Sequence, residues 1–202
     1  MTPGIPAAVI GAPDWFVAGA GRTSGERRSA LFLDRDGIIN INLGYVHTAE
    51  GTHWVPGIFE LARAAHDAGY LIIVVTNQAG IARGYYSEED FIAYTRWLHA
   101  EFERRGAPLC ATYYCPHHPS AGIGSLRTDC SCRKPGIGML QSAVKDWGLD
   151  LSTSVLVGDS LTDIQAADAA RIPLAFLCAG GDLRPALTFL TRISGRSEGG
   201  LK

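Results

Sequence analysis

The stretch Leu31-Phe32-Leu33-Asp34-Arg35-Asp36-Gly37 decides the fold. Its apolar start, Ala30 to Leu33, predicts a short buried strand. Two carboxylates, Asp34 and Asp36, follow this strand, and side chains two positions apart on extended backbone point to the same face. Gly37 then allows a sharp turn. The stretch therefore predicts a polar site at the carboxyl end of a buried strand.

Helix and strand patterns alternate along the rest of the chain. Apolar periodicity and helix-end signals predict helices at 58–68, 87–105, 139–147 and 161–170, and strands at 70–75, 111–114, 154–157 and 174–177. Ser87, followed by three acidic residues, is a good N-cap for the second helix. The alternation predicts an α/β fold, a three-layer, doubly wound and mostly parallel sheet with its ligand site at the carboxyl ends of the strands.

Length and composition indicate one soluble domain with a small ligand. The chain has 202 residues, 47% of them hydrophobic and 19% charged, with a formal net charge of −2. This charge gives no broad attraction to nucleic acid or anionic membrane. No apolar run approaches the roughly 18 residues of a membrane helix, and residues 1–12 lack the basic start of a secretory signal. We expect a cytoplasmic monomer with neither nucleic acid nor membrane as partner.

Three segments are expected along the chain. Residues 1–28 are rich in Gly, Pro and Ala without sustained periodicity, and they read as an N-terminal extension whose best packing candidates are Trp15, Phe16 and Val17. Residues 29–180 form the main domain, and residues 181–202 a C-terminal helix and tail.

Groups suited to phosphate follow two other positions in the pattern. Thr76 ends the strand at 70–75, where its hydroxyl and the following backbone amides can bind a phosphate oxygen. Arg133 and Lys134 are fixed by Pro135 before a helix, so that Lys134 can neutralise phosphate and Arg133 can grip an oxyanion with two hydrogen bonds. The alternatives are a polar strand cap and a solvated basic turn.

A second pair of carboxylates, Asp159 and Asp163, follows the strand at 154–157. Neighbouring carboxylates repel unless a cation lies between them or one is protonated. Asp159 could therefore complete a Mg²⁺ site with the first pair, and Asp163 could hold the metal ligands in place without contacting the ion itself. The alternative is that Asp159 is an N-cap of the next helix.

A cluster of soft ligands predicts a second metal site. Cys115, His117, Cys130 and Cys132 offer three thiolates and one imidazole at the two ends of one loop, the ligand set of a closed structural zinc site. His118 is a weaker candidate than His117, and two reduced cysteine pairs without metal are the alternative. The remaining cysteines, 110 and 178, read as buried thiols.

Five side chains in this order resemble the haloacid dehalogenase (HAD) superfamily of phosphohydrolases: Asp34, Asp36, Thr76, Lys134 and Asp159. The resemblance implies a HAD-like, Rossmannoid fold in which Asp34 attacks phosphorus and Asp36 donates and then removes a proton. It also implies that Thr76 and Lys134 hold the phosphoryl group. Mg²⁺ would be bound by Asp34, Asp159 and the backbone carbonyl of Asp36.

Within that superfamily, the zinc loop at 115–132, Gly80 to Gly84 and Tyr113 to Pro119 are similar to the D-glycero-D-manno-heptose 1,7-bisphosphate 7-phosphatases. That family implies a capless domain, removal of the 7-phosphate from the sugar, and a role in carbohydrate metabolism that supplies lipopolysaccharide precursors. The implied substrate contacts are Asn42, Leu43, Gly44, Tyr45, Thr76, Asn77, Gln78, Ala79, Arg133 and Lys134. The family often has Asp in place of Asn42 and Lys in place of Ser160, departures that bear on substrate or anomer preference.

Two other functions compete with this one. Histidinol-phosphate phosphatases share the scaffold and the zinc ligands, but their zinc loop is shorter than residues 115–132, so the loop length here favours the sugar bisphosphate. The other alternative is an inactive zinc-containing binding module. The complete set of five catalytic groups speaks against it, because an inactive descendant need not keep all five.

Overall fold

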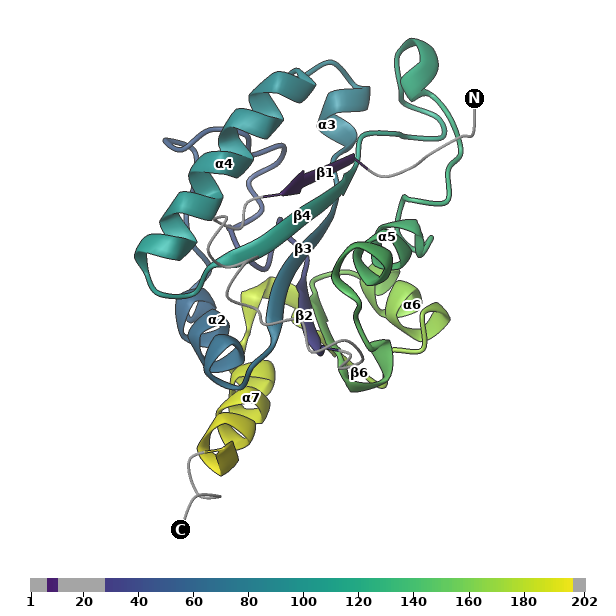
Figure 1. Ribbon diagram of the computed structural model, residues 1–202. Helices are drawn as coiled ribbons and strands as arrows, with labels where there is room; N and C mark the ends of the chain where they lie inside the picture. The colour runs from purple at the N-terminus through teal and green to yellow at the C-terminus, as the bar shows by residue number, and fades with distance from the viewer. Residues whose placement is uncertain (1–6, 11–27, 198–202) are drawn as a thin grey trace.

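The computed structural model describes residues 7–10 and 28–197, which build a central sheet with helices on both faces (Figure 1). The sheet order is β1-β4-β3-β2-β5-β6. Every neighbouring pair is parallel except β1 and β4, which are antiparallel. The predicted α/β class is confirmed. The strands are β1 (Ala7–Ile10), β2 (Ala30–Leu33), β3 (Leu71–Asn77), β4 (Leu109–Cys115), β5 (Val155–Gly158) and β6 (Leu174–Leu177).

Each face of the sheet is covered by its own helices (Figure 1). Leu31 and Leu33 pack in the apolar cluster with α2, α4 and α7, whereas Phe32 packs in the cluster with α5 and α6. This alternation follows from the two-residue period of a strand. The helices are α2 (Ile58–Asp67), α3 (Ala79–Ala82), α4 (Glu88–Arg104), α5 (Gly138–Trp147), α6 (Leu161–Ala169) and α7 (Arg184–Ser197), with short 3₁₀ turns at Gly124–Leu126, Leu151–Thr153 and Ala179–Gly181.

The predicted elements are present, with ends shifted by a few residues. The strand predicted at 70–75 runs on to Asn77, and the one predicted at 111–114 starts at Leu109. Ser87 is the N-cap of α4 and forms a capping box with Asp90, as its sequence indicates. None of the helices in residues 7–10 and 28–197 has the length and hydrophobicity to cross a lipid bilayer.

The first strand and the last helix join the domain in different ways. Ala7–Ile10 pairs antiparallel with β4 at the edge of the sheet, a strand that the sequence pattern does not reveal. Trp15, Phe16 and Val17 lie outside the described residues. In α7, Ala186 and Leu190 are fully buried in the cluster that also holds α2. The segment limits at 28 and 180 stay a prediction.

Four neighbouring parallel strands, β4, β3, β2 and β5, end at one edge of the sheet. Asp34 directly follows β2, and Asp159 directly follows β5. Thr76 is the last but one residue of β3, and Cys115 ends β4. Groups that are far apart in the sequence therefore meet at the carboxyl edge, where open α/β sheets bind ligands.

Candidate active site

A cavity of about 390 Å³ opens at this edge. Strand ends and the loops that follow them supply its walls. Its lining residues are Asp34, Asp36, Asn42, Gly44, Tyr45, Thr76, Asn77, Gln78, Ala79, Gly80, Tyr86, Lys134, Asp159, Ser160 and Thr162.

All of the predicted catalytic, magnesium-binding and substrate-binding residues lie in this lining except Leu43 and Arg133. The side chain of Leu43 is 62% exposed to solvent. Arg133 turns toward the cysteine loop, where its Nη1 atom donates to the carbonyl of His117 at 3.2 Å. Four lining residues were not predicted from the sequence: Gly80, Tyr86, Ser160 and Thr162.

Lys134 is buried between carboxylates at the floor of the site. Its Nζ atom lies 2.9 Å from Asp34 Oδ1 and 2.5 Å from Asp163 Oδ1, and it donates to the carbonyl of Val75 at 2.8 Å. Its backbone is held by Asn77, whose Oδ1 accepts from the Lys134 amide. The ammonium group is thus fixed beside Asp34, where it can stabilise negative charge on a phosphoryl group.

The carboxylates of Asp34, Asp159 and Asp163 each place one oxygen within 4.8 Å of the others. Burial raises the pKa of Asp34 to about 7, although Lys134 opposes the rise. Burial, followed by repulsion from Asp163, also raises the pKa of Asp159. A divalent cation between these oxygens would offset both effects, and oxygen is the ligand that Mg²⁺ prefers, so the residues fit a magnesium site.

Gly37 is required for the two acidic loops to approach. Its φ of +88° lies in the left-handed region, and a Cβ atom there would overlap the carboxylate of Asp159. The sharp turn expected after Asp36 is present. Any side chain at this position would push the loop after β2 away from the loop after β5.

The N-cap of α6 is Ser160, so the alternative interpretation of Asp159 as the cap is wrong. Asp163 Oδ2 accepts from the Ser160 amide at 3.1 Å and from its hydroxyl at 2.6 Å. The other oxygen of Asp163 contacts Lys134. Asp163 thus supports the site from a fully buried position, and Asp159 keeps its carboxylate in the cavity.

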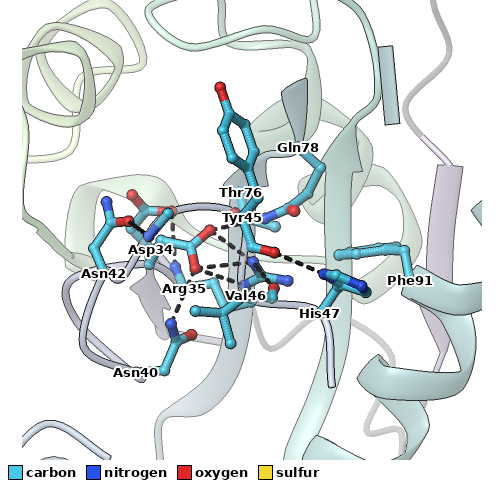
Figure 2. Close-up of polar contacts among 12 residues, drawn as sticks. Asp34, Arg35, Asn40, Asn42, Tyr45, Val46, His47, Thr76, Gln78 and Phe91 are labelled. Carbon is cyan, nitrogen blue, oxygen red and sulfur yellow. Dashed lines mark hydrogen bonds and ion pairs between the residues drawn. The ribbon is translucent and has the colours of Figure 1, made fainter. Parts of the chain in front are cut away.

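Asp36 turns its carboxylate away from the other acids and toward Arg35. The Arg35 guanidinium contacts both Asp36 oxygens, at 2.8 and 2.7 Å, and also donates to the carbonyl of Val46 at 2.7 Å. Asn40 Nδ2 donates to Asp36 Oδ1 at 3.0 Å, and Gln78 Nε2 to Oδ2 at 3.2 Å. Figure 2 draws these contacts of Arg35, Asn40 and Gln78. The two carboxylates of the first pair therefore have different surroundings, as different roles require.

Sequence reasoning missed Arg35 as a site residue. It is 2% exposed, and its guanidinium carbon lies 5.7 Å and 5.3 Å from the ring centres of Phe91 and Tyr94 on α4. A charged residue between two Asp at the end of a buried strand is itself a signal, because a buried cation needs an acidic partner.

Cys115, His117, Cys130 and Cys132 come together as a second group, each offering a ligand atom within 4.8 Å of the others. The sulfurs are 3.2 to 3.5 Å apart, too far for the roughly 2.05 Å of a disulfide bond. A tetrahedral zinc site with Zn–S bonds of about 2.3 Å places its sulfurs about 3.8 Å apart, so this group has the size and ligands of a metal site.

The protonation chemistry of this group also suits a metal. The hydrogen bonds of Cys132 with Cys115 and Cys130 lower the pKa of Cys132 to about 5, whereas the hydrogen bond with Cys132 and burial raise the pKa of Cys115, and burial raises the pKa of Cys130. One thiolate shared among three sulfurs is therefore favoured, and a bound cation would favour the ionised form of the other two. His118 instead accepts from the amides of Ser120 and Ala121 through Nδ1 and stays outside the group. Cys110 and Cys178 are buried apart from it, as expected.

Comparisons with known proteins match this geometry. The family model described as HAD-hydrolase-like matches residues 131–187. The chain is 49% identical to the D-glycero-alpha-D-manno-heptose-1,7-bisphosphate 7-phosphatase of Burkholderia mallei over 156 residues, 77% of this chain and 82% of that protein. The chain belongs to the heptose bisphosphate phosphatase family. A second member, the D-glycero-beta-D-manno-heptose-1,7-bisphosphate 7-phosphatase of Vibrio cholerae, is 45% identical over 154 residues, 76% of this chain and 83% of that protein.

Solved structures place the family on the same fold. A HAD-like phosphatase from Mesorhizobium loti superposes with a TM-score of 0.78 at 31% identity, covering 97% of this chain and 96% of that chain. The D,D-heptose 1,7-bisphosphate phosphatase from B. bronchiseptica, complexed with magnesium and phosphate, superposes with a TM-score of 0.66 at 27% identity, covering 85% and 98%. The protein is an enzyme of this family, a HAD-type phosphatase.

Proposed function

We propose that this enzyme removes the 7-phosphate of D-glycero-D-manno-heptose 1,7-bisphosphate with the help of Mg²⁺, through a phosphorylated Asp34. The observation that carries the proposal is the meeting of Asp34, Asp36, Thr76, Lys134 and Asp159 in one cavity. The names of the relatives supply the substrate. In this role the enzyme serves the synthesis of lipopolysaccharide precursors.

In the first step, a carboxylate oxygen of Asp34 attacks phosphorus and the bond from phosphorus to the sugar oxygen breaks. Asp36 donates its proton to that leaving oxygen. The Thr76 hydroxyl donates a hydrogen bond to the phosphoryl group, and Lys134 neutralises charge on the equatorial oxygens. Both groups are already in place, because Thr76 is 1% and Lys134 5% exposed to solvent.

In the second step, Asp36 removes a proton from water, and the water oxygen attacks the phosphorus of the acyl phosphate. The bond from phosphorus to the Asp34 oxygen breaks, which releases inorganic phosphate and restores both carboxyl groups. Asp36 lines the cavity but lies outside the group of Asp34, Asp159 and Asp163. This position suits a residue that donates and accepts protons.

Asp34, Asp159 and the backbone carbonyl of Asp36 would hold Mg²⁺. The ion, when bound, stabilises the negative charge that develops on the transferred phosphoryl group. Asp163 would keep both Lys134 and the start of α6 in place beside the metal ligands.

The cysteine loop would hold zinc through Cys115, His117, Cys130 and Cys132 as a structural ion, which orders the segment at 115–132 that borders the site. The substrate contacts would be Asn42, Leu43, Gly44, Tyr45, Thr76, Asn77, Gln78, Ala79, Arg133 and Lys134. Leu43 and Arg133 would reach the part of the substrate that extends out of the cavity. We further propose a cytoplasmic monomer.

The test compares kcat/KM for phosphate release from both anomers of the heptose bisphosphate and from histidinol phosphate. The proposal expects a strong preference for one heptose anomer and dependence on added Mg²⁺. A preference for histidinol phosphate would contradict the substrate assignment. Negligible rates on all three substrates would favour a binding function.

A further inference from the structure

A chain of hydrogen bonds leads from a buried tyrosine to the two groups that act on phosphate and protons. The hydroxyl of Tyr86 donates to Gln78 Oε1 at 2.6 Å. Gln78 Nε2 in turn donates to Thr76 Oγ1 at 2.8 Å and to Asp36 Oδ2 at 3.2 Å. The amide of Gln78 is 1% exposed, so water cannot replace these partners easily.

The direction of each bond follows from the chemistry of its partners. A carboxylate only accepts hydrogen bonds, so Asp36 requires the NH₂ end of the Gln78 amide. The oxygen end then faces Tyr86 and needs a donor. Burial raises the pKa of Tyr86 to about 12, so its phenol keeps its proton at neutral pH and supplies that donor. Tyr86 therefore prevents the amide from turning its oxygen toward Asp36.

Tyr86 is itself held in one position. Its ring stacks on His47, with ring centres 4.5 Å apart and planes 18° apart. A Cβ atom on Gly80 would collide with the Tyr86 ring, so glycine at position 80 makes room for it. Gly80 thus leaves room for the ring of Tyr86, whose hydroxyl contacts Gln78.

The same amide also directs the hydroxyl of Thr76. Because Gln78 Nε2 is a donor, Thr76 Oγ1 acts as the acceptor in this bond. The proton of the Thr76 hydroxyl is then available for a phosphoryl oxygen in the cavity. One glutamine amide consequently sets the orientation of both the phosphate-binding hydroxyl and the proton-transfer carboxylate.

We propose that Tyr86 is a positioning residue which, through Gln78, orients Asp36 and Thr76 for the reaction. The inference rests on the proposed roles of these two residues. Tyr86 itself does not transfer a proton to the substrate. Its contribution appears in kcat, because the geometry of the reacting groups matters most in the transition state.

The first test is Tyr86→Phe, with Tyr114→Phe as the matched control. Tyr114 lies in the same apolar cluster, is also buried, and donates to Glu88 at 2.6 Å, but it does not line the cavity. Both variants lose one hydrogen bond that a tyrosine hydroxyl donates to a side-chain oxygen. We expect Tyr86→Phe to lower kcat about tenfold with little change in KM, and Tyr114→Phe to keep kcat. Equal kcat values for the two variants, at equal melting temperatures, would overturn the proposal.

The second test asks whether Tyr86 acts through Gln78. In a Gln78→Ala background, adding Tyr86→Phe should change kcat by less than about twofold, because the relay is already broken. Effects that multiply would show that Tyr86 acts by another route and would overturn the proposal. A crystal structure of Tyr86→Phe decides the positioning without turnover: an amide that has left Asp36 is expected, and an unmoved one contradicts the proposal. An inactive wild-type enzyme would instead refute the proposed function.

Discussion

The Nζ atom of Lys134 lies 2.9 Å from a carboxylate oxygen of Asp34, and both residues are buried, Asp34 directly after β2 and Lys134 in the loop before α5. The same ammonium group contacts Asp163, which is fully buried. One cation thus neutralises two carboxylates, one from the loop after β2 and one from the first turn of α6. This arrangement links the stability of the site to its chemistry.

Lys134→Ala should destabilise the protein and abolish turnover. The change leaves two buried carboxylates without their cation, which costs about 3–5 kcal/mol when one partner of a buried ion pair is removed. Urea unfolding gives the free energy. Lys145→Ala, which removes an exposed lysine on α5, is the control and should change stability little. A Lys134→Ala variant as stable as this control would show that the ion pairs contribute nothing.

The metal-free protein should lose stability as the pH rises from about 4 to 7. The pKa of Asp34 is raised from 3.8 to about 7 in the folded protein, so the folded state holds a proton that the unfolded state has released. The stabilising contribution is therefore complete below pH 3.8 and lost as the pH passes 7. Asp34→Asn removes this titration, so the wild-type protein should become progressively less stable than the variant as the pH rises from about 4 to 7.

Mg²⁺ should reverse this trend, because it binds the ionised carboxylates. Its stabilising effect is expected to grow as the pH rises toward 7 and to be weaker in Asp34→Asn. Unfolding at several pH values, with and without Mg²⁺, measures both effects. Stabilisation by Mg²⁺ that is equal at all pH values, or equal in the two proteins, would contradict this assignment of the metal ligands.

Arg35→Lys should lower stability and kcat together. Arg35 contacts Asp36 through two nitrogens, Nε and Nη2, and its planar group faces the rings of Phe91 and Tyr94. A lysine has one nitrogen and no planar group, so it loses part of these buried contacts, at about 1–3 kcal/mol. Arg104→Lys on the exposed face of α4 is the matched control, because its guanidinium contacts Glu101 in solvent. Thermal melts and steady-state kinetics separate the two effects. Wild-type values for Arg35→Lys would mean that the bidentate contact is dispensable.

The elements of the fold were predictable because both periodicities are strong here. Leu31, Phe32 and Leu33 alternate between two apolar clusters, and Ser87 caps α4 as its sequence indicates. The strand at Ala7–Ile10 was not predictable, because four apolar residues in a Gly- and Pro-rich segment have no periodicity to distinguish them. Its pairing depends on the open edge of β4.

Site residues were predictable where they lie at the end of a strand or directly after it. Thr76 near the end of β3, and Asp34 and Asp159 directly after β2 and β5, fall into this class, since the ends of parallel strands must meet at one edge. Tyr86 was not predictable, because its contact with Gln78 depends on the path of the chain through α3. The inward turn of Arg35 likewise depends on the rings of α4, more than fifty residues later in the sequence.

Loss of zinc from the cysteine cluster should disturb the loop at 115–132 more than it lowers kcat. Cys132→Ala deletes one of four ligands, so the bound zinc should fall from about one per chain toward none, with a lower melting temperature. Selectivity between heptose bisphosphate and histidinol phosphate should weaken more than kcat. Cys110→Ala, a buried cysteine outside the cluster, is the control. Equal zinc content in the two variants would contradict the assignment of Cys132 as a zinc ligand.

The most direct test of the catalytic account is to trap the phosphorylated enzyme. In the Asp36→Asn variant, Asp34 should still attack the phosphorus of the substrate. The amide at position 36 cannot activate water, so phosphate should accumulate on the protein. Rapid acid quench followed by mass spectrometry of peptides locates the phosphate. The account predicts phosphate on Asp34 and none in the double variant Asp34→Asn, Asp36→Asn. Phosphate on another residue, or full turnover by Asp34→Asn, would contradict it.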